Sequence, residues 1–106
     1  MTQLEQTIIA TAQRHLAAVQ AFYAKFSAGT ADNDDRDDYQ GDHAALYALL
    51  EIGHLSESGM SPDGIAALQS IEDDATAAFA HRAQIRAPDI RPSRLLDRLR
   101  SPAILR

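Results

Sequence analysis

The first 28 residues constrain the fold more than any other part of the sequence, because their apolar residues recur at steps of three and four without a break. This spacing predicts one long helix with a single face towards a core. Thr2 and Glu5 have the T-x-x-E spacing of a capping box, and Gly29 is a natural helix end. A helix of about 25 residues, roughly 37 Å long, would be the scaffold of the fold. The predicted apolar face comprises Leu4, Ile8, Ile9, Ala12, Leu16, Val19, Phe22, Tyr23 and Phe26.

Two shorter stretches repeat the same period. The first follows a predicted N-cap at Asp42 and runs over residues 43–55, with Gly53 inside it, where close helix packing would explain a glycine. The second starts at Ser61, Pro62 and Asp63 and continues to Pro88. The chain of 106 residues is long enough for one domain, and 20 of them are alanine, which favours helices. We therefore predict an all-α fold: a small bundle of three main helices plus a short basic C-terminal helix.

Charge divides the chain into two parts. Residues 1–81 carry 13 acids and 3 bases, whereas residues 82–106 carry 7 bases and 2 acids. Three prolines interrupt the basic part, and a short helix fits from about residue 92 to residue 100, with a narrow edge of Leu95, Leu96 and Leu99. We predict an acidic helical bundle domain over residues 1–87 and an Arg- and Pro-rich C-terminal segment over residues 88–106. That segment would pack on the bundle, on a twin or on a partner.

Aspartate is concentrated between residues 31 and 43. Asp, Asn and Gly dominate this stretch, so we expect a connection of about a dozen residues between the first two helices. The spacing does not fit an EF-hand, since Arg36 falls on a ligand position in either alignment. The stretch is therefore a solvated connection, a surface for a basic partner or a weak site for a divalent cation. The aspartates of that surface would be Asp32, Asp34, Asp35, Asp37, Asp38 and Asp42.

The C-terminal arginines offer a second binding surface, for an anionic protein or for a nucleic acid. Aromatic side chains for base stacking are absent after Phe79, which counts against specific nucleic-acid recognition. Non-specific binding would also have to overcome the acidic body. The arginines that we expect to contact a partner are Arg91, Arg94, Arg98 and Arg100.

Few residues suggest chemistry. Glu51 and His54 have the Glu-x-x-His spacing that presents two metal ligands on one helical face, and His43 lies on the same predicted stripe, which gives an alternative metal-binding bundle. The second Glu-x-x-His of such sites is missing, so a polar helix face is the simpler interpretation. His15 lies on the apolar stripe of the first helix and is expected to be half-buried and hydrogen-bonded. The chain has no cysteine, no G-x-S-x-G turn and no glycine-rich phosphate loop, so we expect neither catalysis nor a cofactor.

These features favour a non-catalytic protein-binding module, that is, an adaptor, an inhibitor or a regulatory subunit that acts through charged helical surfaces. Nucleic-acid binding through the C-terminal segment and metal binding remain the alternatives. A core rich in alanine removes little apolar surface from water, so a homo-oligomer is also expected. No apolar run could span a bilayer, and the N-terminus lacks the features of a secretory signal, so we expect a cytoplasmic protein without membrane contact.

Overall fold

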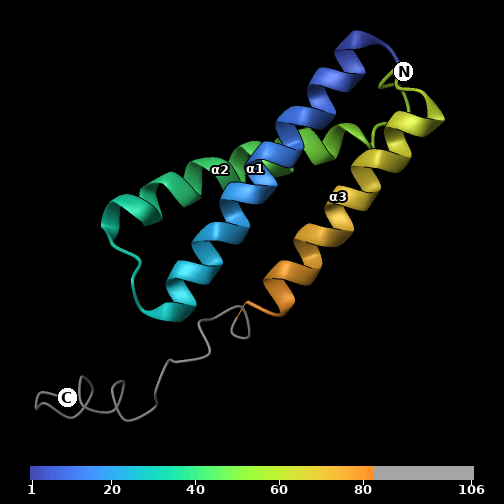
Figure 1. Ribbon diagram of the computed structural model, residues 1–106. Helices are drawn as coiled ribbons and strands as arrows, with labels where there is room; N and C mark the ends of the chain where they lie inside the picture. Colours follow the sequence, from blue (N-terminus) through green and yellow to red (C-terminus); the bar gives the residue numbers. More distant parts are fainter. Residues whose placement is uncertain (83–106) are drawn as a thin grey trace, which may run out of the picture.

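The computed structural model describes residues 1–82, which form three helices and, within that range, no strand (Figure 1). The helices are α1 (Gln3–Ala28), α2 (Asn33–Ile52) and α3 (Pro62–Ala80). The predicted all-α bundle of three main helices is thereby confirmed. The expected short C-terminal helix, the boundary at residue 87 and the segment 88–106 lie outside the described residues.

α1 is the central element of the bundle. It packs against both α2 and α3, whereas α2 and α3 touch each other little. α2 carries the chain back along α1, so that α1 and α3 run parallel and both end at the same end of the bundle (Figure 1). Two contacts fix this arrangement: Ser61 meets Glu5 at one end, and the Ser27 hydroxyl donates a hydrogen bond to the carbonyl of Arg82 at the other.

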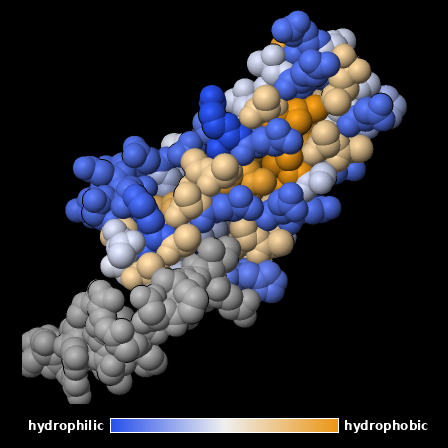
Figure 2. All heavy atoms as spheres, viewed as in Figure 1, coloured by the Kyte–Doolittle hydropathy of each residue, from blue (hydrophilic) through white to orange (hydrophobic). Residues whose placement is uncertain are grey.

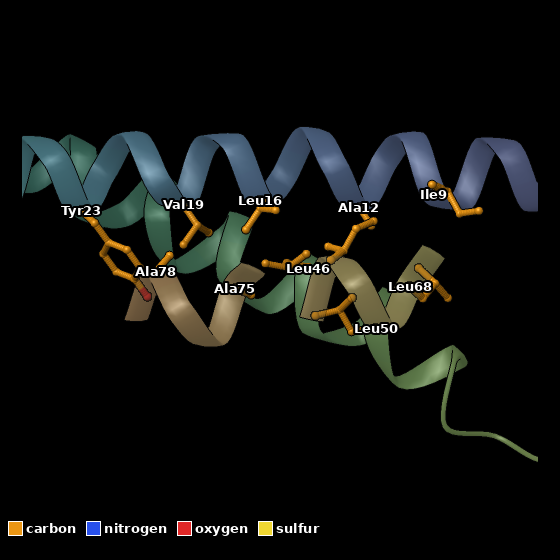
Figure 3. Packing of buried hydrophobic residues seen from close by; sticks show 11 residues of the cluster. Ile9, Ala12, Leu16, Val19, Tyr23, Leu46, Leu50, Leu68, Ala75 and Ala78 are labelled. Carbon is orange, nitrogen blue, oxygen red and sulfur yellow. The ribbon is translucent and has the colours of Figure 1, made fainter. Parts of the chain in front are cut away.

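The core is a single row of apolar side chains between α1 and the other two helices (Figure 3). Ala12 is fully buried at the middle of α1, where its small side chain leaves room for the helix opposite. Leu46, Val19 and Leu68 are the largest side chains that are almost completely buried. The core comprises Ile9, Ala12, Leu16, Val19, Tyr23, Leu46, Leu50, Leu68, Ile71, Ala75 and Ala78.

Both predicted ends of α1 are confirmed. Thr2 and Glu5 form the capping box, and Gly29 ends the helix with a φ of 75°, a left-handed conformation that suits glycine. The predicted apolar face is confirmed in its centre but wrong at its edges. Leu4 and Phe26 are 70% and 52% exposed, since they lie at the two ends of α1 where the other helices do not cover them.

The prediction of a loop over residues 31–43 is wrong, because α2 already begins at Asn33. Asp32, not Asp42, is the N-cap: its side chain accepts a hydrogen bond from the Asp35 amide, and the Asp35 side chain accepts one from the Asp32 amide. Aspartate is a poor helix former in a helix interior but a good one at the N-terminus, where the helix dipole favours negative charge. Packing of Tyr39 against α1 then holds the next turn in place.

The predicted ends of the other two helices are also too late. α2 ends at Ile52 instead of residue 55, and Gly53 is its C-cap rather than an interior residue. Close packing does explain this glycine, since a Cβ placed there would lie 3.3 Å from Leu68 Cβ. α3 ends at Ala80, with His81 as its C-cap, well before Pro88. Phe79 is 49% exposed because it lies in the last turn of α3.

Glu5 is a buried charge that the sequence analysis treated only as a cap. Its side chain is 5% exposed, and its Oε1 accepts hydrogen bonds from the amide and the hydroxyl of Thr2, at 3.1 and 3.2 Å. Its Oε2 accepts two more, from the amide and the hydroxyl of Ser61, at 2.8 and 2.7 Å. These bonds, above all the one from the Ser61 hydroxyl, lower the pKa of Glu5 from 4.5 to about 2. One carboxylate therefore joins the first turns of α1 and α3.

Candidate partner-binding surface

Ring contacts connect all six phenylalanines and tyrosines of the chain, with Tyr47 joined to the others through His43. α1 contributes three of them, α2 two and α3 one, and each ring lies within 6.5 Å, centroid to centroid, of another aromatic or histidine ring. Three phenylalanines and three tyrosines are all that the sequence contains. We call the six residues the aromatic cluster: Phe22, Tyr23, Phe26, Tyr39, Tyr47 and Phe79.

The inner part of the aromatic cluster is rigidly packed. Phe22 of α1 and Tyr39 of α2 stack with their centroids 4.4 Å apart and their planes 19° apart. Tyr23 is 4% exposed, and its hydroxyl lies 3.3 Å from that of Tyr39. Burial raises the pKa of Tyr23, and the hydrogen bond with Tyr39 raises it further, so that the Tyr23 hydroxyl stays neutral over the physiological range. These three rings tie α1 to α2.

The outer part of the aromatic cluster is open. Phe26 and Phe79 are 52% and 49% exposed, although aromatic side chains of this size favour burial. The Arg82 guanidinium lies 4.0 Å from the Phe79 ring centroid, a cation–π geometry. A hollow of about 160 Å³ lies between these side chains, which we call the aromatic hollow. Its lining is Phe22, Tyr23, Phe26, Tyr39, Phe79 and Arg82.

The first turns of α2 carry the aspartates that the sequence singled out, and these divide into two groups. Three of them contact other parts of the described chain. Asp32 caps α2, and the Asp35 carboxylate pairs with the Lys25 ammonium of α1 at 3.0 Å. Asp42 forms a hydrogen bond of 2.7 Å with half-buried His15. The Asp32 amide, more than the Lys25 ammonium, lowers the pKa of Asp35.

The other three aspartates point into solvent. Asp34, Asp37 and Asp38 are exposed, and within residues 1–82 none of them forms an ion pair. Figure 2 shows hydrophilic atoms covering this start of α2. Arg36 is the only basic side chain in the same turns. These three carboxylates therefore remain available for a partner, and we call them the free aspartates.

A second hollow, of about 230 Å³, connects the two kinds of surface. It runs between the second half of α1 and the first half of α2. Alanines and the Phe22–Tyr39 stack form its apolar side, and carboxylates line its other rim. The lining residues are Ala18, Ala21, Phe22, Lys25, Asp35, Asp38, Tyr39 and Asp42. One partner segment could therefore place an apolar side chain against the alanines and rings and a Lys or Arg against the carboxylates.

Of the residues of the metal alternative, Glu51 and His54 line one hollow together with Glu72, whereas His43 lies elsewhere. The His43 ring lies between those of Tyr39 and Tyr47, with centroids 5.5 and 4.6 Å away. His54 lies beyond the end of α2, and its Nε2 is 2.6 Å from Glu72 Oε1 of α3. In the part of the chain that the structure describes, no three His, Asp or Glu side chains are grouped to hold a metal ion.

Arg91, Arg94, Arg98 and Arg100 lie outside the described residues, so the structure does not place the second predicted surface. Of the three described helices, none is both long and apolar enough to pass through a lipid bilayer. The aromatic cluster was not predicted, although the sequence holds one signal for it: Phe22, Tyr23 and Phe26 stand within five residues at the end of α1. The chain matches no family model, no curated protein and no solved structure.

Proposed function

We propose that the protein is a non-catalytic protein-binding module that binds a basic partner protein at the aromatic cluster and the free aspartates. The observation that carries this proposal is the half-exposure of Phe26 and Phe79, together with three aspartates at the start of α2 that form no ion pair within residues 1–82. Aromatic residues are enriched at protein interfaces and dominate their binding energy, whereas charges at the rim set the rate of encounter and the specificity. The module would thus act as an adaptor, an inhibitor or a regulatory subunit.

The chemistry of the surface defines the partner segment. It should carry at least one apolar or aromatic side chain for the second hollow or the aromatic hollow, and Lys or Arg residues for the free aspartates. Arginine fits best, because it pairs with carboxylates and also stacks on the exposed rings. Nucleic acid is a poor ligand for the same surface, since its phosphates would meet aspartates.

The test is affinity capture with the full chain and two matched variants. The first variant, Phe26→Ala with Phe79→Ala, removes the exposed rings. The second, Leu4→Ala with Leu55→Ala, removes apolar side chains that are 70% and 55% exposed but lie outside the aromatic cluster. We expect a basic protein to be retained by the wild type and by the second variant and to be lost from the first.

Circular dichroism should show the same helix content for all three proteins, because all the substituted side chains are largely exposed. The proposal is refuted if the same proteins are retained by all three baits, or if the protein that the wild type retains is acidic. Each retained protein should then be purified and its affinity for the wild type and the first variant measured directly.

The alternatives from the sequence remain separate proposals. Nucleic-acid binding would depend on the arginines of residues 88–106, and retardation of DNA or RNA at low salt would test it. A homodimer would give a mass that depends on concentration. The cytoplasm is the compartment that we propose, and microscopy of the tagged chain would test it.

A further inference from the structure

We infer that the part of the chain after Arg82, residues 83–106, covers the aromatic hollow, with the leucine edge of its predicted short helix on the exposed rings and its arginines towards the start of α2. This inference goes beyond the proposed function, because the occupant belongs to the same molecule and a partner protein would have to displace it from the exposed rings. It rests on where the described chain ends, on the length of the C-terminal segment and on the charges of the two surfaces.

The described chain ends at the rim of the hollow. Arg82 belongs to its lining, with its guanidinium over the Phe79 ring. The carbonyl of Arg82 also accepts a hydrogen bond from the Ser27 hydroxyl, which anchors the backbone to the last turn of α1. α1 and α3 end side by side at this end of the bundle (Figure 1). Residue 83 therefore starts next to the surface that we propose it covers.

The remaining length suits this short path. Residues 83–91 could span at most roughly 30 Å when extended, and the helix expected over residues 92–100 would be about 13 Å long. A short tether of this kind gives an effective concentration in the millimolar range, as is typical of flexible linkers. A contact with a dissociation constant well below the millimolar range would then be occupied most of the time.

The two surfaces also complement each other chemically. Residues 83–106 contain six arginines and two aspartates, and the start of α2 presents the free aspartates. In the predicted short helix, Leu95, Leu96 and Leu99 would form an apolar edge that the helix itself cannot bury. Phe26 and Phe79 are half-exposed, and nothing in residues 1–82 covers them. Docking would remove both apolar surfaces from water at once.

The test is a nuclear Overhauser experiment on the full chain with labelled leucine methyl groups and phenylalanine rings. Three phenylalanines make the ring signals few enough to assign. We expect cross-peaks between leucine methyls and the rings of Phe26 and Phe79. The variant Leu95→Ser, Leu96→Ser and Leu99→Ser identifies their source, and Leu4→Ser, which changes an exposed leucine at the other end of α1, is the control.

The inference is supported if these cross-peaks persist on dilution, vanish in the triple variant and remain in the control. Their absence from the wild-type spectrum would overturn it. So would cross-peaks that survive in the triple variant, since Leu95, Leu96 and Leu99 would then not be their source. A mixed sample of labelled and unlabelled chains distinguishes a contact within one chain from a contact between two copies. Cross-peaks between molecules would assign the hollow to a second copy and overturn the intramolecular contact.

Discussion

Two glycines in helices provide the sharpest test of how Glu5 is held. Gly41 lies in the middle of α2 and Gly64 in the first turn of α3. A Cβ at Gly41 would meet nothing within 4 Å. A Cβ at Gly64 would lie 2.9 Å from Met60 Cε and still closer to Glu5 Oε2, nearer than real Cβ atoms come to other heavy atoms. The same substitution to alanine should therefore have opposite effects at the two sites.

The magnitudes follow from propensity and packing. Gly41→Ala should stabilise the protein by about 0.5–1 kcal/mol, because alanine loses less backbone entropy in a helix. At Gly64 this gain is opposed by overpacking, which typically costs about 1–3 kcal/mol. Met60 can rotate away from the new methyl group, but Glu5 cannot move without breaking its bonds to Ser61. Gly64→Ala should therefore be destabilising.

Urea unfolding of the two variants, monitored by circular dichroism at 222 nm, measures both effects. In thermal unfolding, 1 kcal/mol corresponds to a shift in Tm of roughly 4–8 °C for a domain of this size. A stabilising Gly64→Ala would refute the account of Glu5 as a fixed group. The substitution should also lose most of its cost when it is made in a Glu5→Ala background, because the clashing carboxylate is then absent.

Three further predictions concern the buried charge, the core and the acidic surface. Glu5→Gln should make the free energy of unfolding less dependent on pH in acid. In the wild type, the contribution of the Glu5 carboxylate is complete above its ordinary pKa of 4.5 and is lost as the pH falls towards about 2. Urea unfolding at several pH values would measure this difference. Leu46→Ala should cost about 2–5 kcal/mol of unfolding free energy, because this side chain is completely buried; a cost below about 1 kcal/mol in the same assay would contradict the assigned core. Replacing the free aspartates Asp34, Asp37 and Asp38 with asparagine should slow association with the basic partner and make the association rate less dependent on salt. The dissociation rate should change little. Stopped-flow measurements at two ionic strengths would check this, and an unchanged association rate would argue against the acidic surface.

The parts of the fold that depend on local signals could be predicted from the sequence. The Thr2–Glu5 capping box and the glycine end of α1 involve residues close in the chain, and both are as expected. The start of α2 was not predicted, because the aspartate-rich composition of residues 31–43 is typical of a loop, whereas the same aspartates also suit the first turn of a helix. Asp32 and Asp35 have the spacing of a capping pair, but six aspartates in eleven residues suggested a loop.

The candidate site could be predicted only in part, since it depends on contacts between distant residues. The stack of Phe22 on Tyr39 and the pair of Lys25 with Asp35 join α1 to α2, and no pattern within either helix specifies them. The division of the aspartates into structural and free ones follows from these contacts as well. Exposure at helix ends, as for Phe26 and Phe79, likewise depends on where the neighbouring helices stop.

The carboxylate of Glu5 has a consequence for how the bundle comes apart. Its bonds to Ser61 connect residues 56 positions apart in the sequence, at the two places where α1 and α3 begin. First turns are normally where helices fray, because their amide groups lack partners within the helix. Here neither first turn can open without exposing the buried charge that serves both. The first turns of α1 and α3 should therefore open together, as one cooperative unit.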